Sequence, residues 1–209
     1  FGVSGDVVPY HCLDTKYGEA TLPPMDAAVR ALIRVNTMDS IYKYEVQRTN
    51  RIGVSLTGLH EWMWKACGMS FQDAINNPDH HVWTFLTEAR QRCEAEAKQY
   101  SRELGRPTPH TVTTIKPAGT TSKLFGLTEG CHLPAMSYYL RWVQFKTDDP
   151  LVVDYRDRGY PTKELTTYQG MTAVGFPTKP LITSLIPPDQ LVTAGDASME
   201  DQFKWLQLL

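Results

Sequence analysis

The strongest constraint on the fold is a run of β-branched residues that ends at a proline. Residues 111–115 read Thr-Val-Thr-Thr-Ile, and β-branched side chains favour a pleated strand. Pro117 ends this strand, because proline lacks an N–H group and holds its own φ angle. Ala118 and Gly119 then give a turn whose backbone lies open to a ligand. We expect a short helix to begin near Lys123, so the stretch predicts a strand, a tight turn and a helix N-terminus.

The same turn carries groups that suit an anion. Three hydroxyl residues lie ahead of the expected helix, and each is a helix-capping type. Free N–H groups at a helix N-terminus attract phosphate, and two lysines, Lys116 and Lys123, flank the turn. The pattern predicts a phosphate-binding loop made of Pro117, Ala118, Gly119, Thr120, Thr121 and Ser122. An ordinary βα turn with a Ser/Thr cap has the same local sequence, so spacing alone leaves both interpretations open.

Strand-like and helix-like segments alternate before this loop. Valine-rich apolar stretches at residues 3–10 and 51–59 predict strands. Residues 25–48 predict a long helix, and a second one is expected between a cap at Asn77 or Asp79 and a stop at Gly105. The expected buried stripe of the first helix is Ala28, Leu32, Val35, Met38, Tyr42 and Val46. This order favours an α/β architecture with a largely parallel sheet or barrel, in which ligands bind at the carboxyl ends of strands.

The remaining segments are less regular. Residues 13–24 hold one glycine and two prolines and predict a surface loop, whereas residues 138–146 have the alternation of a strand. Asp149 is expected to begin a short helix that ends near Gly159. The last helix, over residues 199–209, is expected to be capped by Asp196 or Ser198. Between them, three apolar residues are predicted to lie in strands: Val174, Phe176 and Ile182.

Composition excludes several classes of function. The formal net charge is −2 and basic residues form no runs, so no nucleic-acid partner is expected. No apolar run approaches the roughly 20 residues that span a bilayer, so no membrane partner is expected either. The four cysteines are widely spaced, which argues against a disulfide framework or a structural zinc site and favours a reducing, cytoplasmic setting. They are Cys12, Cys67, Cys93 and Cys131.

Two local patterns invite catalytic readings that the residues do not support. His60 and Glu61 begin a zinc-protease motif, but that motif requires a second histidine where Trp64 stands. Cys131 precedes His132, yet neighbours in an extended segment point to opposite faces, so a thiolate–imidazole dyad is not expected. These residues are therefore interpreted as structural.

Three motifs together resemble a known family, the catalytic subunit of ribonucleotide reductase. They are residues 48–60 (RTNRIGVSLTGLH), 114–122 (TIKPAGTTS) and 130–134 (GCHLP). The expected helix at residues 30–39 and the expected strand at 138–145 fit its adenosylcobalamin-dependent branch, class II. The resemblance covers most of the chain, in order and at plausible spacing.

The resemblance implies a ten-stranded α/β barrel, of which residues 1–209 are the C-terminal portion, and a chain that is a fragment of a longer polypeptide. In the family, the loop that matches residues 117–122 binds the di- or triphosphate of the substrate ribonucleotide. Cobalt–carbon homolysis in adenosylcobalamin generates a thiyl radical on a cysteine, which abstracts the ribose 3′ hydrogen. The 2′-hydroxyl leaves as water, and a dithiol, resupplied by a reductant such as thioredoxin, provides the electrons.

The sequence departs from that pattern in its thiols. The family's finger loop with the radical cysteine and a glutamate is absent, and no cysteine stands near Phe1-Gly2-Val3, where a reducing partner is expected. None of the four cysteines matches these roles. We therefore expect this piece to need the upstream half of the enzyme and to be inactive alone, with no catalytic residue and no metal ligand assigned in it.

Two other classes of protein stay open at this point. A P-loop phosphotransferase is disfavoured, because a Walker loop needs Gly-Lys-Ser/Thr whereas the lysine here follows Gly119-Thr-Thr-Ser. The other is a non-catalytic or split-gene fragment that binds nucleotide phosphate and needs a partner chain.

Overall fold

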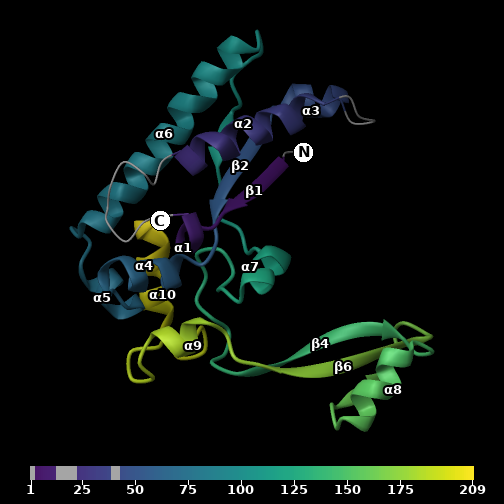
Figure 1. Ribbon diagram of the computed structural model, residues 1–209. Coiled ribbons are helices and arrows are strands. Elements are labelled where there is room, and N and C mark those ends of the chain that lie inside the picture. Colours follow the sequence, from purple (N-terminus) through teal and green to yellow (C-terminus); the bar gives the residue numbers. More distant parts are fainter. Residues whose placement is uncertain (1–2, 13–22, 39–42) are drawn as a thin grey trace.

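The computed structural model describes residues 3–12, 23–38 and 43–209, which form two three-stranded sheets and the helices around them (Figure 1). The strands are β1 (Val3–Val7), β2 (Arg51–Leu56), β3 (Thr111–Thr113), β4 (Tyr139–Lys146), β5 (Thr162–Glu164) and β6 (Met171–Thr178). The helices are α1 (Pro9–Cys12), α2 (Pro23–Thr37), α3 (Lys43–Thr49), α4 (Leu59–Cys67), α5 (Phe71–Asn76), α6 (His81–Glu103), α7 (Gly119–Phe125), α8 (Pro150–Asp157), α9 (Ile182–Leu185) and α10 (Met199–Leu208). The fold is mixed α/β.

The first sheet is parallel, with β2 between β1 and β3. Helices α2 and α6 pack against it and against each other, because their apolar faces meet the apolar side chains of the strands. Val29 and Ala97 are fully buried in this core, beside Val54 of β2. The parallel pairing brings the carboxyl ends of all three strands to one edge of the sheet, which positions the loop after β3.

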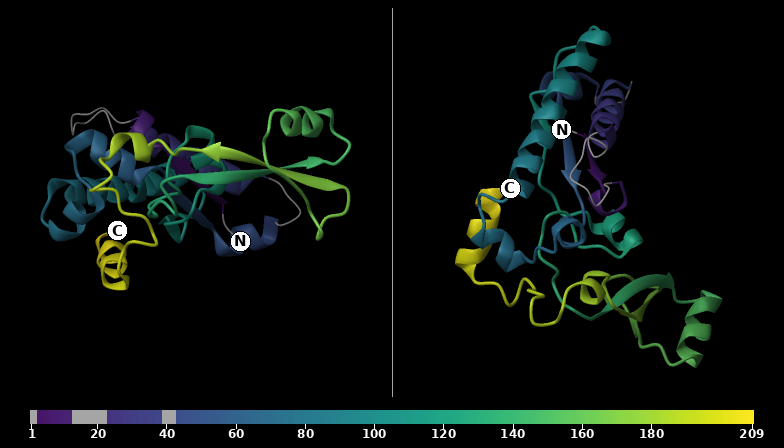
Figure 2. Two further views of the ribbon diagram at one scale, coloured as in Figure 1. Left: turned by 90° about the horizontal axis from the view of Figure 1, so that it is seen from below. Right: turned by 60° about the vertical axis from the view of Figure 1, so that its left-hand side comes forward.

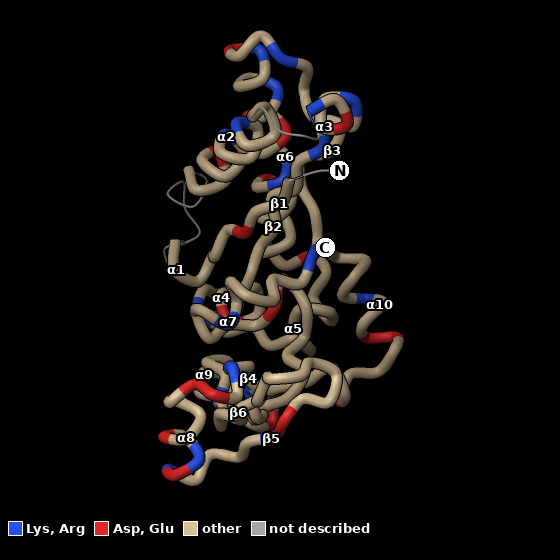
Figure 3. The backbone as a smooth tube through the Cα atoms, turned by 90° about the vertical axis from the view of Figure 1, so that its right-hand side faces the viewer, with Lys and Arg blue, Asp and Glu red and all other residues tan. Residues whose placement is uncertain are grey.

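The second sheet is antiparallel and has β6 between β4 and β5. It projects from the rest of the chain as a long hairpin, with α8 near its far end (Figures 1 and 2). Tyr155 of α8 makes ring contacts with Phe145 and Phe176 on one face of this sheet. Helix α8 carries Asp154, Arg156 and Asp157, so both signs of charge occur along it (Figure 3).

A third group of elements surrounds an aromatic cluster. Helices α4, α5 and α6 contribute Trp62, Phe71 and Trp83, and Trp205 of α10 packs among them. His60 stacks on the Trp205 ring at a centroid distance of 4.7 Å, so α10 is fastened to α4 through this pair. Within the residues described, no helix is both long enough and apolar enough to cross a bilayer.

Several elements are shorter than the sequence predicts. The expected strand at residues 3–10 ends at Val7 and turns into α1, because Pro9 suits a first helical turn. The strand expected at 111–115 ends at Thr113, although the Thr114 N–H still donates to the Val54 carbonyl at 3.0 Å. Of the loop predicted at residues 13–24, residues 13–22 lie outside the described part, and Pro23 and Pro24 already belong to α2.

The long helix predicted at residues 25–48 is described as two helices, α2 and α3, and its predicted stripe was largely wrong. Leu32 is buried, but Val35 and Met38 are 48% and 65% exposed, while Tyr42 lies outside the described residues. The buried face of α2 consists of Met25, Val29, Leu32, Ile33 and Asn36. Apolar residues recur at spacings of three and four residues on two neighbouring faces of this helix. The face that begins at Met25 is the one that packs against the sheet.

Elsewhere the later elements follow the prediction closely. Strand β4, helix α8 with its Asp149 cap and helix α10 with its Ser198 cap are confirmed. Helix α6 is confirmed too, but His80 caps it, since its Nδ1 accepts from the Val82 N–H at 3.2 Å. Ile182 was wrongly predicted as a strand residue and instead begins α9, where it is buried. The predicted largely parallel sheet is confirmed only for β1, β2 and β3, because β4, β5 and β6 form a separate antiparallel sheet.

Candidate functional site

The loop after β3 lies at the carboxyl edge of the parallel sheet, where the sequence predicts it. Helix α7 already begins at Gly119, so Thr120, Thr121 and Ser122 lie inside its first turns and do not precede it. Their predicted role as caps is therefore wrong: Ala118 is the N-cap, and no side chain caps the helix. The Ser122 hydroxyl is buried and donates to the Ala118 carbonyl oxygen.

The outer side of this turn is open. Pro117, Gly119 and Thr120 are exposed and Thr121 is half-buried, whereas Ala118 and Ser122 are buried. A Cβ atom built on Gly119 meets no heavy atom within 4 Å, and Gly119 is not among the glycines with positive φ. The turn therefore does not need glycine for its backbone conformation. What the missing side chain provides is open space in front of the first turn of α7.

Both lysines beside the loop are already paired. The Lys116 ammonium lies 2.7 Å from a carboxylate oxygen of Asp6, whose side chain is only 8% exposed. The Lys123 ammonium lies 2.9 Å from a carboxylate oxygen of Glu129 and 5.2 Å from the centre of the Tyr139 ring. An anion at this turn would therefore meet chiefly backbone N–H groups and threonine hydroxyls, with the lysine charges set back in ion pairs.

Glu61 contacts the segment that follows α7, and the sequence gives no functional role for it. Its carboxylate is fully buried in the first turn of α4 and accepts from the N–H and the hydroxyl of Thr128, each at 2.7 Å. Burial raises the pKa of Glu61, while the bonds from Thr128 act in the opposite direction. A buried acid two residues after a helix start is a weak signal, and its partner lies 67 positions away along the chain.

Cys131 and His132 do not form a catalytic pair. The Cys131 thiol is buried, and burial raises its pKa to about 12. The His132 Nδ1 lies 3.0 Å from the Glu129 carbonyl oxygen. Cys93 is a core residue of the parallel sheet and its helices, and burial raises its pKa to about 11. Neither thiol is present as a thiolate near neutral pH.

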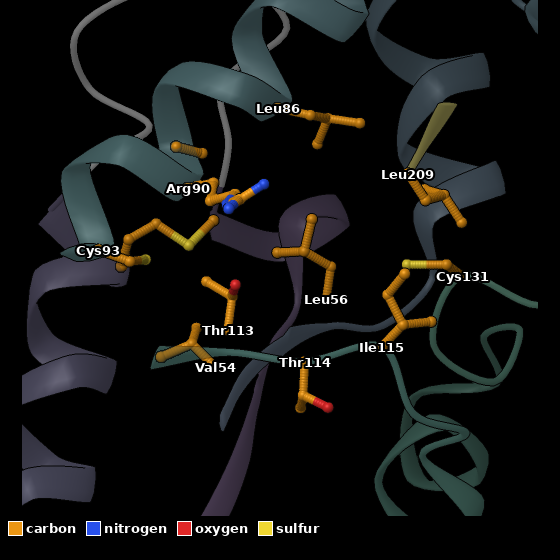
Figure 4. Close-up of a pocket in the computed structure, with 12 residues that line it drawn as sticks. Val54, Leu56, Leu86, Arg90, Cys93, Thr113, Thr114, Ile115, Cys131 and Leu209 are labelled. Carbon is orange, nitrogen blue, oxygen red and sulfur yellow. The ribbon is translucent and has the colours of Figure 1, made fainter. Parts of the chain in front are cut away.

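Two adjoining apolar cavities lie beside the carboxyl half of β3. The first, of about 350 Å³, is enclosed by α6, β2 and β3, with Cys93 and Cys131 on opposite sides (Figure 4). The second, of about 700 Å³, runs along α10. Ile115, Cys131 and Leu209 line both cavities, so together they form one apolar groove. Within the described ranges, no cluster of three or more His, Cys, Asp or Glu side chains is placed to hold a metal ion.

No protein-family model matches the chain. Its similar curated proteins share one name. The adenosylcobalamin-dependent ribonucleoside-triphosphate reductase of Lactobacillus gasseri is 31% identical over 183 residues, which cover 78% of this chain and 24% of that protein. The enzyme of the same name from Lactobacillus acidophilus is 28% identical over 172 residues, or 76% of this chain and 23% of that protein. This chain thus spans about a quarter of the length of these curated relatives.

A solved structure shows a similarity in fold to the same group of enzymes. The crystal structure of a B-12 dependent (class II) ribonucleotide reductase superposes with a TM-score of 0.66 and 25% identity, covering 88% of this chain and 28% of that one. Sequence and structure therefore agree that this chain resembles a part of the adenosylcobalamin-dependent, class II ribonucleotide reductases.

Proposed function

We propose that this chain supplies the substrate-phosphate loop of a class II ribonucleotide reductase, made of Pro117, Ala118, Gly119, Thr120, Thr121 and Ser122. The observation that carries the proposal is the open space in front of Gly119, at the carboxyl end of β3 and at the start of α7. Backbone N–H groups at a helix start suit a phosphate, and the missing Cβ lets the ligand approach the backbone closely.

The whole enzyme, on this proposal, reduces ribonucleotides to 2′-deoxyribonucleotides in the cytoplasm by a cobalamin-initiated thiyl-radical mechanism. An external dithiol such as thioredoxin then reduces the enzyme again for the next turnover. The names of the relatives favour a ribonucleoside triphosphate over a diphosphate as the substrate. Adenosylcobalamin is proposed for the enzyme as a whole. The cavities of the described residues are mainly apolar and offer no built site for it, so we assign no residue of this chain to the cofactor.

We further propose that the parallel sheet belongs to a ten-stranded α/β barrel, with residues 1–209 as its C-terminal portion. The apolar groove and the exposed side chains of Met199, Phe203 and Leu206 on α10 support packing against the upstream half of that barrel. Alone, the chain is expected to be inactive, because its buried thiols have raised pKa values and match none of the family's roles. The alternative is a non-catalytic fragment that binds nucleotide phosphate and needs a partner chain.

Calorimetry on the 209-residue chain tests the phosphate loop. The wild-type chain is expected to bind a nucleoside triphosphate, and a diphosphate more weakly, whereas the bare nucleoside is not expected to bind measurably. Gly119→Ala and Gly119→Val place carbon atoms in the open space and are expected to weaken triphosphate binding by about tenfold or more, since close approach of the backbone is lost. Alanine does not strain the free turn, because nothing lies within 4 Å of its Cβ.

Gly195→Val is the matched control for this experiment. Gly195 also lacks a positive φ, and the nearest atom to a new Cβ is the Thr193 hydroxyl at 3.9 Å, an ordinary van der Waals distance. This variant is expected to bind as the wild type does. Equal affinity of the Gly119 variants and the wild type for the triphosphate would refute the proposed loop.

A further inference from the structure

The segment Leu127–Gly130 lies between the start of α4 and the phosphate loop. It runs along the first residues of α4, where the Gly58 N–H donates to the Thr128 carbonyl at 3.1 Å and the Leu59 N–H to the Gly130 carbonyl at 3.4 Å. Gly58 has a positive φ of 72°, and a Cβ there would lie 2.8 Å from Leu127 Cδ1. The left-handed backbone at position 58 therefore favours glycine, and a side chain there would press on that of Leu127.

Glu61 forms two hydrogen bonds with the middle of this segment. Its two carboxylate oxygens accept from the backbone N–H and from the side-chain hydroxyl of Thr128, so both oxygens are bonded although the side chain is fully buried. Burial raises the pKa of this carboxyl group, while the bonds from Thr128 and the positive charge of Lys123 act in the opposite direction. A buried carboxylate loses its hydration, and such a group persists only where its bonds hold it in place.

The same segment contacts both ends of the loop. At the far end, the Leu127 N–H donates to the Ser122 carbonyl at 2.9 Å, which closes the last turn of α7. At the near end, a Cβ on Gly130 would lie 2.1 Å from the carbonyl oxygen of Lys116, the residue just before Pro117. Thr128 therefore lies in a segment that contacts the chain on both sides of the loop, at Lys116 and at Ser122.

We propose that Glu61 is a positioning residue for the phosphate loop, acting through its paired hydrogen bonds to Thr128. The inference rests on the proposed function, since it names the group that holds the substrate-phosphate loop in its binding geometry. Glu61 itself touches no substrate. Its carboxylate sets where Thr128 lies, and Thr128 sets the distance between Lys116 and the end of α7.

The test compares variants of the full 209-residue chain by calorimetry with a nucleoside triphosphate and by amide hydrogen exchange. Thr128→Val keeps the shape but removes the hydroxyl donor, and it is expected to weaken triphosphate binding about tenfold and to speed exchange over residues 117–123. Thr128→Ser restores the hydroxyl and is expected to bind within about twofold of the wild type. Glu61→Gln tests the acceptor side and is expected to fall between these two.

Thr172→Val is the matched control, because Thr172 is equally buried and loses a hydroxyl that bonds Thr147 at 3.0 Å in the separate β4–β6 sheet. It is expected to leave binding and loop exchange unchanged. Wild-type affinity in Thr128→Val, or failure of Thr128→Ser to restore binding, would overturn the positioning role while the loop assignment stands. A wild-type chain that binds no triphosphate, with exchange still faster in Thr128→Val, would overturn the phosphate assignment and leave the hydrogen-bonded support intact.

Discussion

At the scale of single residues, burial decides what the thiols of this chain do. Cys93 and Cys131 lie in apolar surroundings, and burial raises their pKa values to about 11 and about 12. Cys12 is exposed, although its pKa is also raised by partial burial, and its thiol donates to the Val8 carbonyl at 3.0 Å. The reactive form of cysteine is the thiolate, so exposure and pKa together rank the thiols.

Alkylation by iodoacetamide at pH 8 checks this ranking. Cys12 is expected to react first in the folded chain, while Cys93 and Cys131 are expected to stay unmodified until the chain is unfolded in urea. Peptide mass spectrometry at timed intervals measures each site separately. Alkylation of Cys131 at a rate similar to that of Cys12 would contradict the buried thiol and reopen a redox role for it.

The sequence predicts the residues of the loop but not their support. Residues 117–122 follow one another, and proline, glycine and hydroxyl residues have strong local preferences, so the turn and its place after a strand were predictable. The place of Ser122 inside α7 was not, because it depends on where the helix begins. Glu61 meets Thr128 only through the packing of α4 on the loop, which no local pattern encodes.

At the scale of elements, one stacked pair joins α10 to α4. His60 is buried against Trp205, and its Nε2 has no hydrogen-bond partner. Burial lowers the pKa of His60 from 6.5 to about 4. The Trp205 indole N–H donates to the Cys131 carbonyl at 2.8 Å, so the same helix also contacts the segment after the loop. We therefore expect the docking of α10 on α4 to depend on a neutral His60.

The burial of neutral His60 predicts that the folded chain loses stability in mild acid. In the unfolded chain the His60 imidazole becomes protonated below pH 6.5, whereas in the folded chain it stays neutral until about pH 4. Between these pH values the unfolded state therefore binds more protons than the folded state. The free energy of unfolding is expected to fall by up to about 3 kcal/mol between these pH values on account of this group. Urea unfolding at a series of pH values measures the loss.

His60→Phe is the control for the pH effect, since it keeps an aromatic ring against Trp205 and removes the titrating group. Its stability is expected to depend less on pH between 6.5 and 4 than that of the wild type. An identical pH dependence in both proteins would show that His60 is not the responsible group.

At the scale of the whole molecule, the chain divides into a parallel sheet that presents the loop and an antiparallel sheet that projects from it. The sequence predicts β1 to β4 and places Val174 and Phe176 of β6 in strands, because alternation and β-branching are local properties, but it does not predict β5. It does not predict that β4 and β6 pair with each other, since pairing partners are set by tertiary contacts. The resemblance to class II reductases was confirmed, whereas the complete barrel stays a proposal.

The most direct test of the central claim is a nuclear magnetic resonance titration of the ¹⁵N-labelled chain with a nucleoside triphosphate, repeated with the same nucleoside lacking phosphate. We predict saturable shifts of the Gly119, Thr120 and Thr121 amide signals with the triphosphate alone, while amides of the β4–β6 sheet stay unmoved. Such shifts would identify the start of α7 as the phosphate site. Triphosphate shifts confined to the apolar groove or to the second sheet, with none at these three amides, would contradict the account.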